Sequence, residues 1–327
     1  MKITILTEKD LRQCVQLDKA ALDTVAEGFT QLTEGNVTVP PIMRVDVLEN
    51  HGEVDVKTAY IAGMDSFAIK MASGFHDNRL KGLPTGSGLM ILISAETGIP
   101  MAVLLDNGYL TDVRTGIAGA IAAQHLGRKG IETAGVIGSG MQARFQMEAL
   151  KIVRDYQRLY VYGIISAEVD QYAREMADQL GVEVIQAKDA ETVVRESEIL
   201  VTATPSQQPY LQADWLHPGL HITCMGSDSE HKQELFPDVF ARADLVVCDR
   251  KSQAFRLGEL HHAKEAGIIT NEGQVIELGE LTSGSKLGRQ DDDQITICDL
   301  TGVGVQDTQI ARLAYREAQS KGLGFSI

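Results

Sequence analysis

The stretch "AGVIGSGMQARFQMEAL", residues 134–150, decides the fold of this chain. The apolar run that leads into it, "ETAGVIG", is typical of a buried parallel strand, and a helical pattern follows Gly140. Gly138 permits a tight turn, and Gly140 lets backbone N–H groups approach a pyrophosphate at the helix N-terminus. Ala143 replaces the usual third glycine, a position that affects only helix–strand packing. The stretch therefore predicts a strand–turn–helix unit that binds a dinucleotide.

The end of the next strand lacks the acid that usually holds the adenosine ribose, about 20 residues beyond the glycines. Its sequence is "VYGIIS", residues 161–166, which contains neither an acid nor an arginine for a 2′-phosphate. Ser166 and backbone groups are the remaining ribose ligands. We prefer NAD as the cofactor, because an unpaired 2′-phosphate in an acidic protein is the costlier arrangement, and NADP stays open.

The order of elements indicates two domains. From the glycine stretch onward, strand-like and helical segments alternate, which indicates βαβ units and a parallel sheet. Before it, one helical stretch at 7–35 precedes short strand-like runs, as in a mainly antiparallel meander. The last helix lies beyond the parallel sheet, and we expect it to return to the first domain. The predicted fold class is α/β, with a doubly wound, Rossmann-type parallel sheet over 116–304 and an α+β domain over 1–115 and 305–327.

Length and composition limit the classes of function. At 327 residues and 44% apolar content, the chain suits two domains with a sizeable core in each. A net charge of −15 without a basic stripe argues against nucleic acid and anionic membranes as partners. The cysteines lack the spacing of a metal site, and no apolar run approaches the roughly 18 residues of a membrane span. We therefore expect a cytoplasmic protein without a metal.

Basic residues within apolar runs stand out in so acidic a chain. Lys70 lies in the middle of "SFAIKMASG", where a buried ammonium group needs an anion. Arg44, Lys57 and Lys70 are equally spaced, so neighbouring strands could place them on one face. Arg114 ends the run "NGYLTDVRTG" at the domain junction. Each residue alone reads as a snorkelling or ion-paired side chain, but together they predict a clamp for carboxylates.

A second polar cluster follows a predicted strand in "CMGSDSEHKQEL", residues 224–235. It starts at the carboxyl end of the parallel sheet, where open α/β folds bind ligands. Asp228 could be a general base or orient a water molecule there, with Lys232 nearby. Alternatively, Asp228 caps a helix that begins near Glu230. The residues of this stretch leave both interpretations open.

These stretches together resemble the ornithine cyclodeaminase/mu-crystallin family over essentially the whole chain. The matching motifs are "LPT" at 83–85, "TDVRTG" at 111–116, "GVIGSGMQA" at 135–143, "MGSDSEHKQEL" at 225–235 and "DLTGVGVQD" at 299–307. The stretch "GEVDVKTAY" is most similar to the branch linked with ectoine utilization. The resemblance implies a dimerisation domain completed by the C-terminal helix, a Rossmann domain, and hydride transfer between a nicotinamide and the α-carbon of an amino or imino acid.

The resemblance also implies roles for single residues. Asp228 and Lys70 would be catalytic. The substrate would be bound by Arg44, Lys57, Lys70, Arg114, Thr301 and Gly302. The cofactor would be lined by Thr85, Arg114, Gly138, Ser139, Gly140, Met141, Gln142, Thr204, Met225, Gly226 and Lys232.

The charge at residue 57 bears on the choice of substrate. Ornithine-type members carry an acid near this position, which suits a second ammonium group, whereas Lys57 suits a second carboxylate. We therefore expect reduction of a dicarboxylic imine such as iminosuccinate, by a homodimer. A redox-neutral cyclodeaminase acting on a diamino acid is the alternative, and a crystallin-like binding protein is a further one.

Overall fold

The computed structural model describes residues 2–327. Contacts divide the chain into two compact units, and the first contains both ends of the sequence. The first unit comprises Met1–Arg114 and Val303–Ile327, and the second comprises Thr115–Gly302. Helix α3 (Tyr109–Leu126) contains the boundary at Arg114. The two units are described separately.

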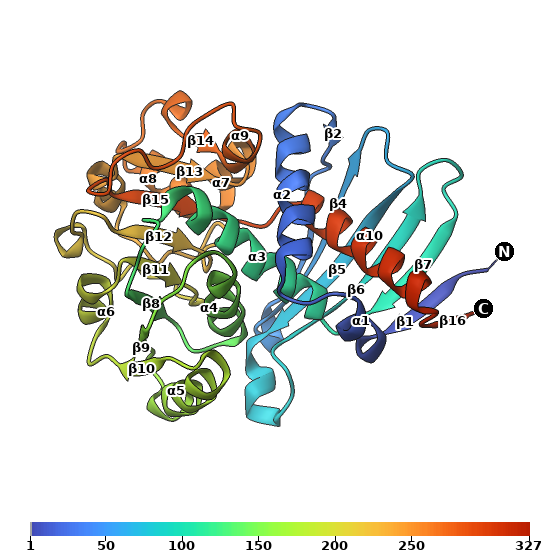
Figure 1. Cartoon of the computed structure of the whole chain (residues 1–327), viewed down its shortest axis with the longest axis horizontal. Helices are drawn as coiled ribbons and strands as arrows, with labels where there is room; N and C mark the ends of the chain where they lie inside the picture. Colours follow the sequence, from blue (N-terminus) through green and yellow to red (C-terminus); the bar gives the residue numbers. More distant parts are fainter. Residues whose placement is uncertain (1) are drawn as a thin grey trace. The chain divides into compact units, whose positions relative to one another are not determined.

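The second unit is built on a sheet whose paired strands all run parallel (Figure 1). The strand order is β10-β9-β8-β11-β12-β15-β13-β14, so the direction of winding reverses between β8 and β11. This order confirms the predicted doubly wound fold. The strands are β8 (Thr133–Ile137), β9 (Arg158–Tyr162), β10 (Glu183–Gln186), β11 (Ile199–Thr202), β12 (His221–Cys224), β13 (Leu245–Cys248), β14 (Ile276–Glu277) and β15 (Thr296–Asp299).

The central strands are apolar because the helices of the unit cover both faces of its sheet (Figure 1). Every residue of β8, β11, β12 and β15 is buried. The helices are α4 (Met141–Val153), α5 (Ser166–Leu180), α6 (Ala190–Glu196), α7 (Lys251–Leu257), α8 (Glu259–Glu265) and α9 (Leu278–Thr282). Short 3₁₀ turns lie at Ala213–Trp215, Pro237–Arg242 and Glu272–Gln274. Residues 237–242 therefore form a 3₁₀ turn and not an α-helix.

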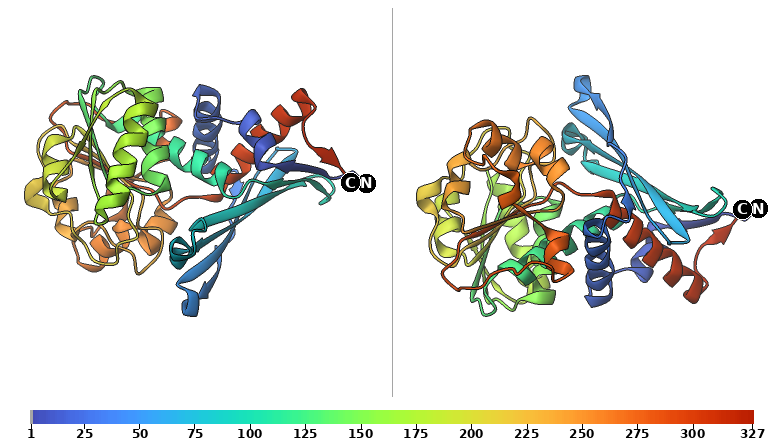
Figure 2. Two further views of the ribbon diagram at one scale, coloured as in Figure 1. Left: turned by 90° about the horizontal axis from the view of Figure 1, so that it is seen from below. Right: turned by 90° about the horizontal axis from the view of Figure 1, so that it is seen from above.

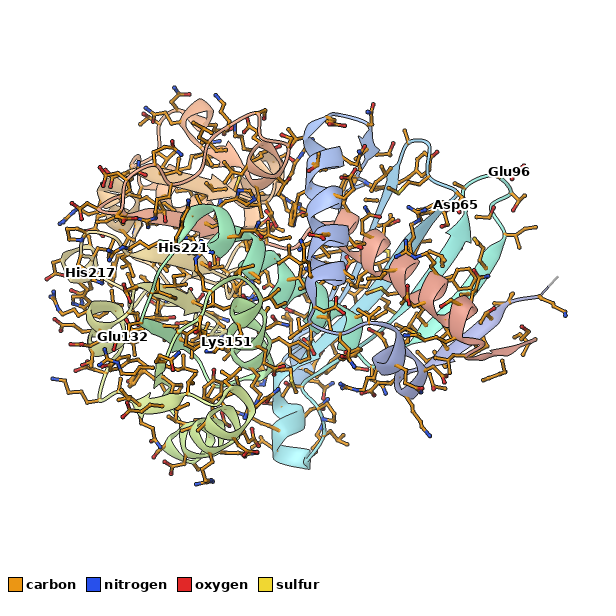
Figure 3. The ribbon with its side chains drawn as sticks, in the orientation of Figure 1. Asp65, Glu96, Glu132, Lys151, His217 and His221 are labelled. Atoms are coloured by element: carbon orange, nitrogen blue, oxygen red, sulfur yellow. The ribbon has the colours of Figure 1, made fainter. Side chains whose placement is uncertain are left out.

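His221 is a buried polar residue within the second sheet (Figure 3). Its ring nitrogens hydrogen-bond the hydroxyls of Thr296 and Thr223 at 2.9 and 3.0 Å. Burial, the largest effect, lowers the pKa of His221 to about 3. The ring is therefore neutral at physiological pH, and its hydrogen bonds tie β12 to β15.

The first unit contains a mainly antiparallel sheet of order β16-β1-β7-β6-β5-β4-β2, with β3 paired to β4. One pair, β1 with β7, is parallel. The strands are β1 (Thr4–Thr7), β2 (Val37–Thr38), β3 (Met43–Val47), β4 (Gly52–Ile61), β5 (Ser66–Phe75), β6 (Gly86–Ser94), β7 (Pro100–Leu105) and β16 (Phe325–Ser326). Two 3₁₀ turns, Leu48–Asn50 and His76–Lys81, precede β4 and β6.

Helices α1 (Glu8–Cys14), α2 (Lys19–Thr33) and α10 (Gly304–Lys321) lie on one face of this sheet (Figure 2). The single helix expected at 7–35 is wrong, because α1 ends at Cys14 and α2 begins after Asp18. Asp18 has an extended backbone, and its carboxylate accepts a hydrogen bond from the Ala21 N–H at 2.9 Å. This cap starts a new helix and breaks the continuous pattern.

The two faces of the first sheet differ. The face under the helices buries small and aliphatic side chains, such as Ala59, Ala68 and Leu92. Among the described residues of this unit, no helix covers the other face (Figure 2). We call that surface the open face; its apolar side chains include Val45, Val56, Ile69, Met71, Leu89, Ile91 and Val103. These residues are half-buried or exposed, so the open face is a wide apolar surface.

Candidate active site

The glycine turn lies at the point where the winding of the second sheet reverses. Gly138 has φ 115°, and a Cβ at this position would lie 2.5 Å from the carbonyl oxygen of Ala203, so only glycine fits. Gly140 is the N-cap of α4, and no side chain caps that helix. A Cβ at Gly140 would meet nothing within 4 Å. The N-terminal N–H groups of α4, on Met141 and Gln142, therefore have space in front of them for an anion.

Arg144 adds a positive charge to this turn, and the sequence reasoning missed it. Its guanidinium donates to the carbonyl oxygens of Ser139 and Gly140 at 2.5 and 3.1 Å. The same group forms an ion pair with Glu175 on α5. The signal in the sequence is a basic residue in the first turn of a helix that follows a glycine motif.

The chain carries no acid between the end of β9 and the start of α5, as the sequence indicates. Helix α5 begins at Ser166, and Ile164 just before it is 92% exposed. A Cβ at Gly163 would lie 3.3 Å from Oγ of Ser139 in the phosphate turn. No acid therefore stands at this strand end, and Gly163 leaves room beside Ser139.

Glu234 is a buried carboxylate that fixes two predicted cofactor residues. It accepts hydrogen bonds from the backbone N–H and the hydroxyl of Thr204 at 2.8 and 2.7 Å, and from the N–H of Gly226 at 3.0 Å. A Cβ at Gly226 would lie 2.2 Å from the Thr204 carbonyl oxygen, so a larger residue cannot be accommodated. Burial raises the pKa of Glu234, and these hydrogen bonds oppose the rise. Met225 precedes this contact, and its N–H donates to Thr202.

Asp249 has the same function for Thr301 and Gly302, the residues that follow β15. Its Oδ2 accepts hydrogen bonds from their N–H groups at 2.8 and 2.7 Å. Asp299, which lies two residues before Thr301 in the chain, is fully buried, and burial raises its pKa to about 8. Neither acid was predicted from the sequence. Each follows an apolar strand, a placement that could have identified them as organisers of the carboxyl edge of the sheet.

Asp228 follows β12 and forms an ion pair with Lys232, with Oδ1 to Nζ at 2.7 Å. The carboxylate is 39% exposed, whereas the Lys232 side chain is only 10% exposed. Residues 228–232 form a turn, so the helix that Asp228 would cap does not exist and that alternative is wrong. Asp228 is thus a solvent-accessible carboxylate beside a buried cation.

In the first unit, Lys70 and Arg114 share one carboxylate, and Lys57 lies beside Lys70. Lys57 and Lys70 are opposite each other on β4 and β5. Asp307 of α10 is fully buried, with its carboxylate 3.1 Å from Nε of Arg114 and 3.7 Å from Nζ of Lys70. Burial lowers the pKa of Lys70 to about 7; Asp307 raises it, and Arg114 and Lys57 lower it further. Asp307 lies within a recognised motif, but the sequence alone did not show its role.

Arg44 faces the same side of the sheet, but its guanidinium is engaged by acids. It forms ion pairs with Asp46, Glu53 and Asp55. Of these acids, Asp55 also raises the pKa of Lys70, so it links Arg44 to the other predicted cations. Thr85 is exposed just before β6, and its carbonyl oxygen accepts a hydrogen bond from the Phe75 N–H.

Comparison with known sequences gives full-length relatives. An uncharacterized cyclodeaminase of Sinorhizobium fredii is 47% identical over 321 residues, which cover 98% of this chain and 97% of the relative. The alanine dehydrogenase of Archaeoglobus fulgidus is 36% identical over 328 residues, covering 100% and 98%.

Solved structures match this chain over nearly its whole length. The Δ1-pyrroline-2-carboxylate reductase of Thermococcus litoralis, in complex with NADH and L-proline, has a TM-score of 0.94 at 30% identity, covering 99% of this chain and 100% of the other. An archaeal alanine dehydrogenase dimer with bound NAD has a TM-score of 0.91 at 35% identity, covering 100% and 99%. The iminosuccinate reductase of Paracoccus denitrificans, in complex with NAD⁺, has a TM-score of 0.90 at 27% identity, covering 100% and 99%.

The TM-scores of these structures confirm the predicted fold. The names of the relatives, which are reductases and dehydrogenases, confirm the prediction of an enzyme. Within residues 2–327, no helix is long and apolar enough to span a membrane. The sequence model of the ornithine cyclodeaminase/mu-crystallin family matches residues 1–322, which include every motif that suggested the resemblance. The chain belongs to that family.

Proposed function

We propose that the chain is an NAD-dependent imine reductase, which reduces a small imino acid to the corresponding amino acid. The observation that carries this proposal is the cluster of Lys70, Arg114 and Asp307, where a lysine with a pKa of about 7 lies beside an arginine. Such a lysine can bind an anion and exchange a proton near neutral pH. Solved relatives that contain NADH, NAD or NAD⁺ support the choice of cofactor.

The glycine turn has the features that a pyrophosphate requires. Gly140 leaves open space before the N-terminus of α4, and Arg144 adds a positive charge beside it. Gly138, Ser139, Met141 and Gln142 complete the turn. Thr204, Met225 and Gly226 lie along the edge that Glu234 organises, so we assign them to the nicotinamide half of the cofactor. We assign Thr85 and Lys232 to the cofactor on the family resemblance alone.

The bound cofactor supplies a hydride to the α-carbon, and residues of the chain do the rest. Arg114 holds the α-carboxylate, since a planar guanidinium binds a carboxylate with two hydrogen bonds. Lys70 adds positive charge and can hold a proton at Nζ. Asp228 carries a proton at its carboxylate to or from the substrate nitrogen, which must be protonated when the C=N bond becomes C–N. Thr301 and Gly302 contribute a fixed hydroxyl and backbone edge.

We propose that the imine carries a second carboxylate, as iminosuccinate does. Lys57 supports this substrate because it adds a buried cation opposite Lys70, beyond the charge that one α-carboxylate needs. Arg44, which is paired with three acids, supports this less strongly than the sequence alone suggested. The resemblance of residues 52–60 to the ectoine-utilization branch supports a role of this reaction in ectoine breakdown.

A second candidate is a redox-neutral cyclodeaminase that acts on a diamino acid. The acids around Arg44 favour it, since Asp46, Glu53 and Asp55 could bind a second ammonium group. The relative from Sinorhizobium fredii has a cyclodeaminase name.

One assay separates the two functions. The purified protein is mixed with NADH, ammonia and either an oxo-dicarboxylate or pyruvate, and NADH oxidation is followed by absorbance. A reductase consumes NADH in proportion to product, fastest with the oxo-dicarboxylate. A cyclodeaminase consumes no NADH overall and instead releases ammonia from ornithine, a result that would contradict our assignment.

We also propose that the enzyme is a homodimer formed through the open face. This surface is apolar, and no described helix of its own unit covers it. The archaeal alanine dehydrogenase of the same fold is a dimer. Pairing two open faces would bury both surfaces in one core.

A further inference from the structure

Helix α8 carries a group of metal-ligand side chains, one of which hydrogen-bonds the backbone of Lys232. His261, His262 and Glu265 each place one ligand atom so that all three atoms lie within 4.8 Å of one another. Among residues 2–327, no other trio of His, Cys, Asp and Glu side chains converges in this way. The two histidines are half-buried and Glu265 is exposed, so solvent reaches the group. Glu265 is three and four residues after the two histidines, a spacing that makes it a neighbour of each on the helix surface.

A hydrogen bond orients the ring of one of these histidines. Nε2 of His262 lies 2.8 Å from the backbone carbonyl oxygen of Lys232. A carbonyl oxygen only accepts, so Nε2 donates this hydrogen bond and Nδ1 is the ring nitrogen that remains for a metal. Metal-binding histidines usually donate their second ring N–H to a carbonyl or carboxylate in this manner.

The type of ligand indicates the type of metal. Two imidazoles and one carboxylate suit Zn²⁺, and suit the hard cations Ca²⁺ and Mg²⁺ poorly. His261 and Glu265 already approach each other, with Nε2 to Oε1 at 3.6 Å. A tetrahedral Zn²⁺ would take these three ligands and keep one position for water.

We propose that His261, His262 and Glu265 form a Zn²⁺ site that stabilises the turn between Ser227 and Lys232. The carbonyl of Lys232 accepts hydrogen bonds from both His262 and the hydroxyl of Ser227, and the Lys232 ammonium pairs with Asp228. A metal on Nδ1 withdraws electron density from the ring and strengthens the Nε2–H donor. Bound Zn²⁺ therefore tightens the turn that carries Asp228. The proposed Zn²⁺ takes no part in the hydride transfer and would affect it only through the turn that carries Asp228.

The test uses tag-free, EDTA-treated protein titrated with ZnCl₂ in a calorimeter. We expect one Zn²⁺ to bind per chain in the wild type. Binding should be lost or weakened at least tenfold in His261→Asn and in Glu265→Gln, neither of which alters the His262–Lys232 hydrogen bond. His51→Asn is the matched control, because His51 also pairs with a single carboxylate, Asp77, and should leave the titration unchanged. Circular dichroism confirms that each variant is folded.

A second measurement tests the connection to the turn. Hydrogen exchange at residues 229–233 should become slower with Zn²⁺ in the wild type and in His51→Asn, and stay unchanged in His261→Asn. Equal Zn²⁺ binding by the wild type and both cluster variants would overturn the site. Stoichiometric binding that leaves exchange in this turn unaltered would overturn its proposed effect on Lys232.

Discussion

Lys57 lies directly opposite Lys70 across the β4–β5 pairing, although both side chains are buried. Directly opposed residues of an antiparallel pair have Cβ atoms about 5 Å apart, and like charges at that distance repel. Burial is the main reason that the pKa of Lys70 falls to about 7; Asp307 opposes the fall, and Arg114 and Lys57 add to it. An anionic substrate would relieve the remaining repulsion. The pair therefore costs free energy of folding and favours binding of negative charge.

Lys57→Met should reduce the preference for a dicarboxylic imine. The substitution keeps the length of the side chain and removes the charge that we assign to the second carboxylate. We expect KM for the oxo-dicarboxylate with ammonia to rise about tenfold or more, equivalent to roughly 1.4 kcal/mol, and KM for pyruvate to change little. Lys188→Met, at a lysine that is 81% exposed, serves as the control. An equal change for both substrates would remove Lys57 from substrate selection.

The pKa of Lys70 should appear in the pH profile of the reductase. The protonated amine holds the anionic substrate, so kcat/KM should fall as pH rises through about 7. In Lys70→Arg the guanidinium stays charged, and the fall should move to higher pH or vanish. Steady-state rates between pH 5.5 and 9, in buffers of constant ionic strength, measure this dependence of kcat/KM on pH. A profile that is identical in the wild type and the variant would show that another group titrates.

Asp228→Asn should lower kcat by roughly 10²–10⁴-fold, the usual contribution of a general acid or base. The amide keeps the shape of the side chain but cannot exchange the proton. Affinity for NADH, measured by fluorescence titration, should stay close to that of the wild type. Asp238→Asn, at another exposed acid of the same unit, should leave both values unchanged. If the folded Asp228→Asn enzyme turned over at a near wild-type rate, another residue would have to be the acid or base.

Asp299 should make the second unit less stable at alkaline pH. Its pKa is raised to about 8 in the folded state, so it stays protonated there while the unfolded chain ionises near pH 4. The stability that this group contributes is complete below about pH 4 and is lost as pH rises through about 8. Lys70, whose pKa is lowered, acts in the opposite direction between about 7 and 10.5, so the comparison must be made against a variant.

Asp299→Asn provides that comparison, because an amide has no charged form. We expect Tm of the wild type to fall relative to the variant between pH 6 and 9, as followed by scanning calorimetry. Asp244→Asn, outside the buried acids, is the control. A difference in Tm that does not change with pH would mean that Asp299 is already ionised in the folded protein.

The dimer proposal predicts that Ile91→Asp yields monomers. Ile91 is in the middle of the open face, and a carboxylate there would be buried without a partner if two open faces met. Light scattering at micromolar concentration should give the dimer mass for the wild type and the monomer mass for the variant. Ile164→Asp, at an isoleucine that is 92% exposed in the second unit, should remain dimeric. A monomeric wild type would contradict the proposal outright.

The sequence predicts most of the parallel sheet, because its strands, except the two-residue β14, lie in apolar runs next to turn signals. It does not predict β1, because the four residues of this strand directly precede a helical pattern. The partner strand, β7, is also far from β1 in the sequence. The break at Asp18 is also hidden, since an aspartate is compatible with a helix interior as well as with a cap.

The sequence likewise predicts some residues of the candidate site and not others. Residues that carry a charge in an unexpected place, such as Lys70, can be identified from the sequence. Their partners cannot, because Asp307 is far away in the chain and resembles any acid in the first turn of a helix. Glu234 and Asp249 act through backbone N–H groups, and no residue pattern reveals which N–H groups a buried carboxylate will meet.

The position of Asp307 in the chain has a consequence for protein synthesis. A ribosome makes Lys70 and Arg114 long before it makes α10, so the nascent first unit has two buried cations without their carboxylate. It also lacks Thr308, whose hydroxyl donates to Ala59 and accepts from the Ala68 N–H. The second unit, which is continuous in sequence, can fold as soon as it leaves the exit tunnel. The half of the enzyme that is translated first is therefore completed last, and a chain truncated before α10 would leave a folded nucleotide domain attached to an unfinished sheet.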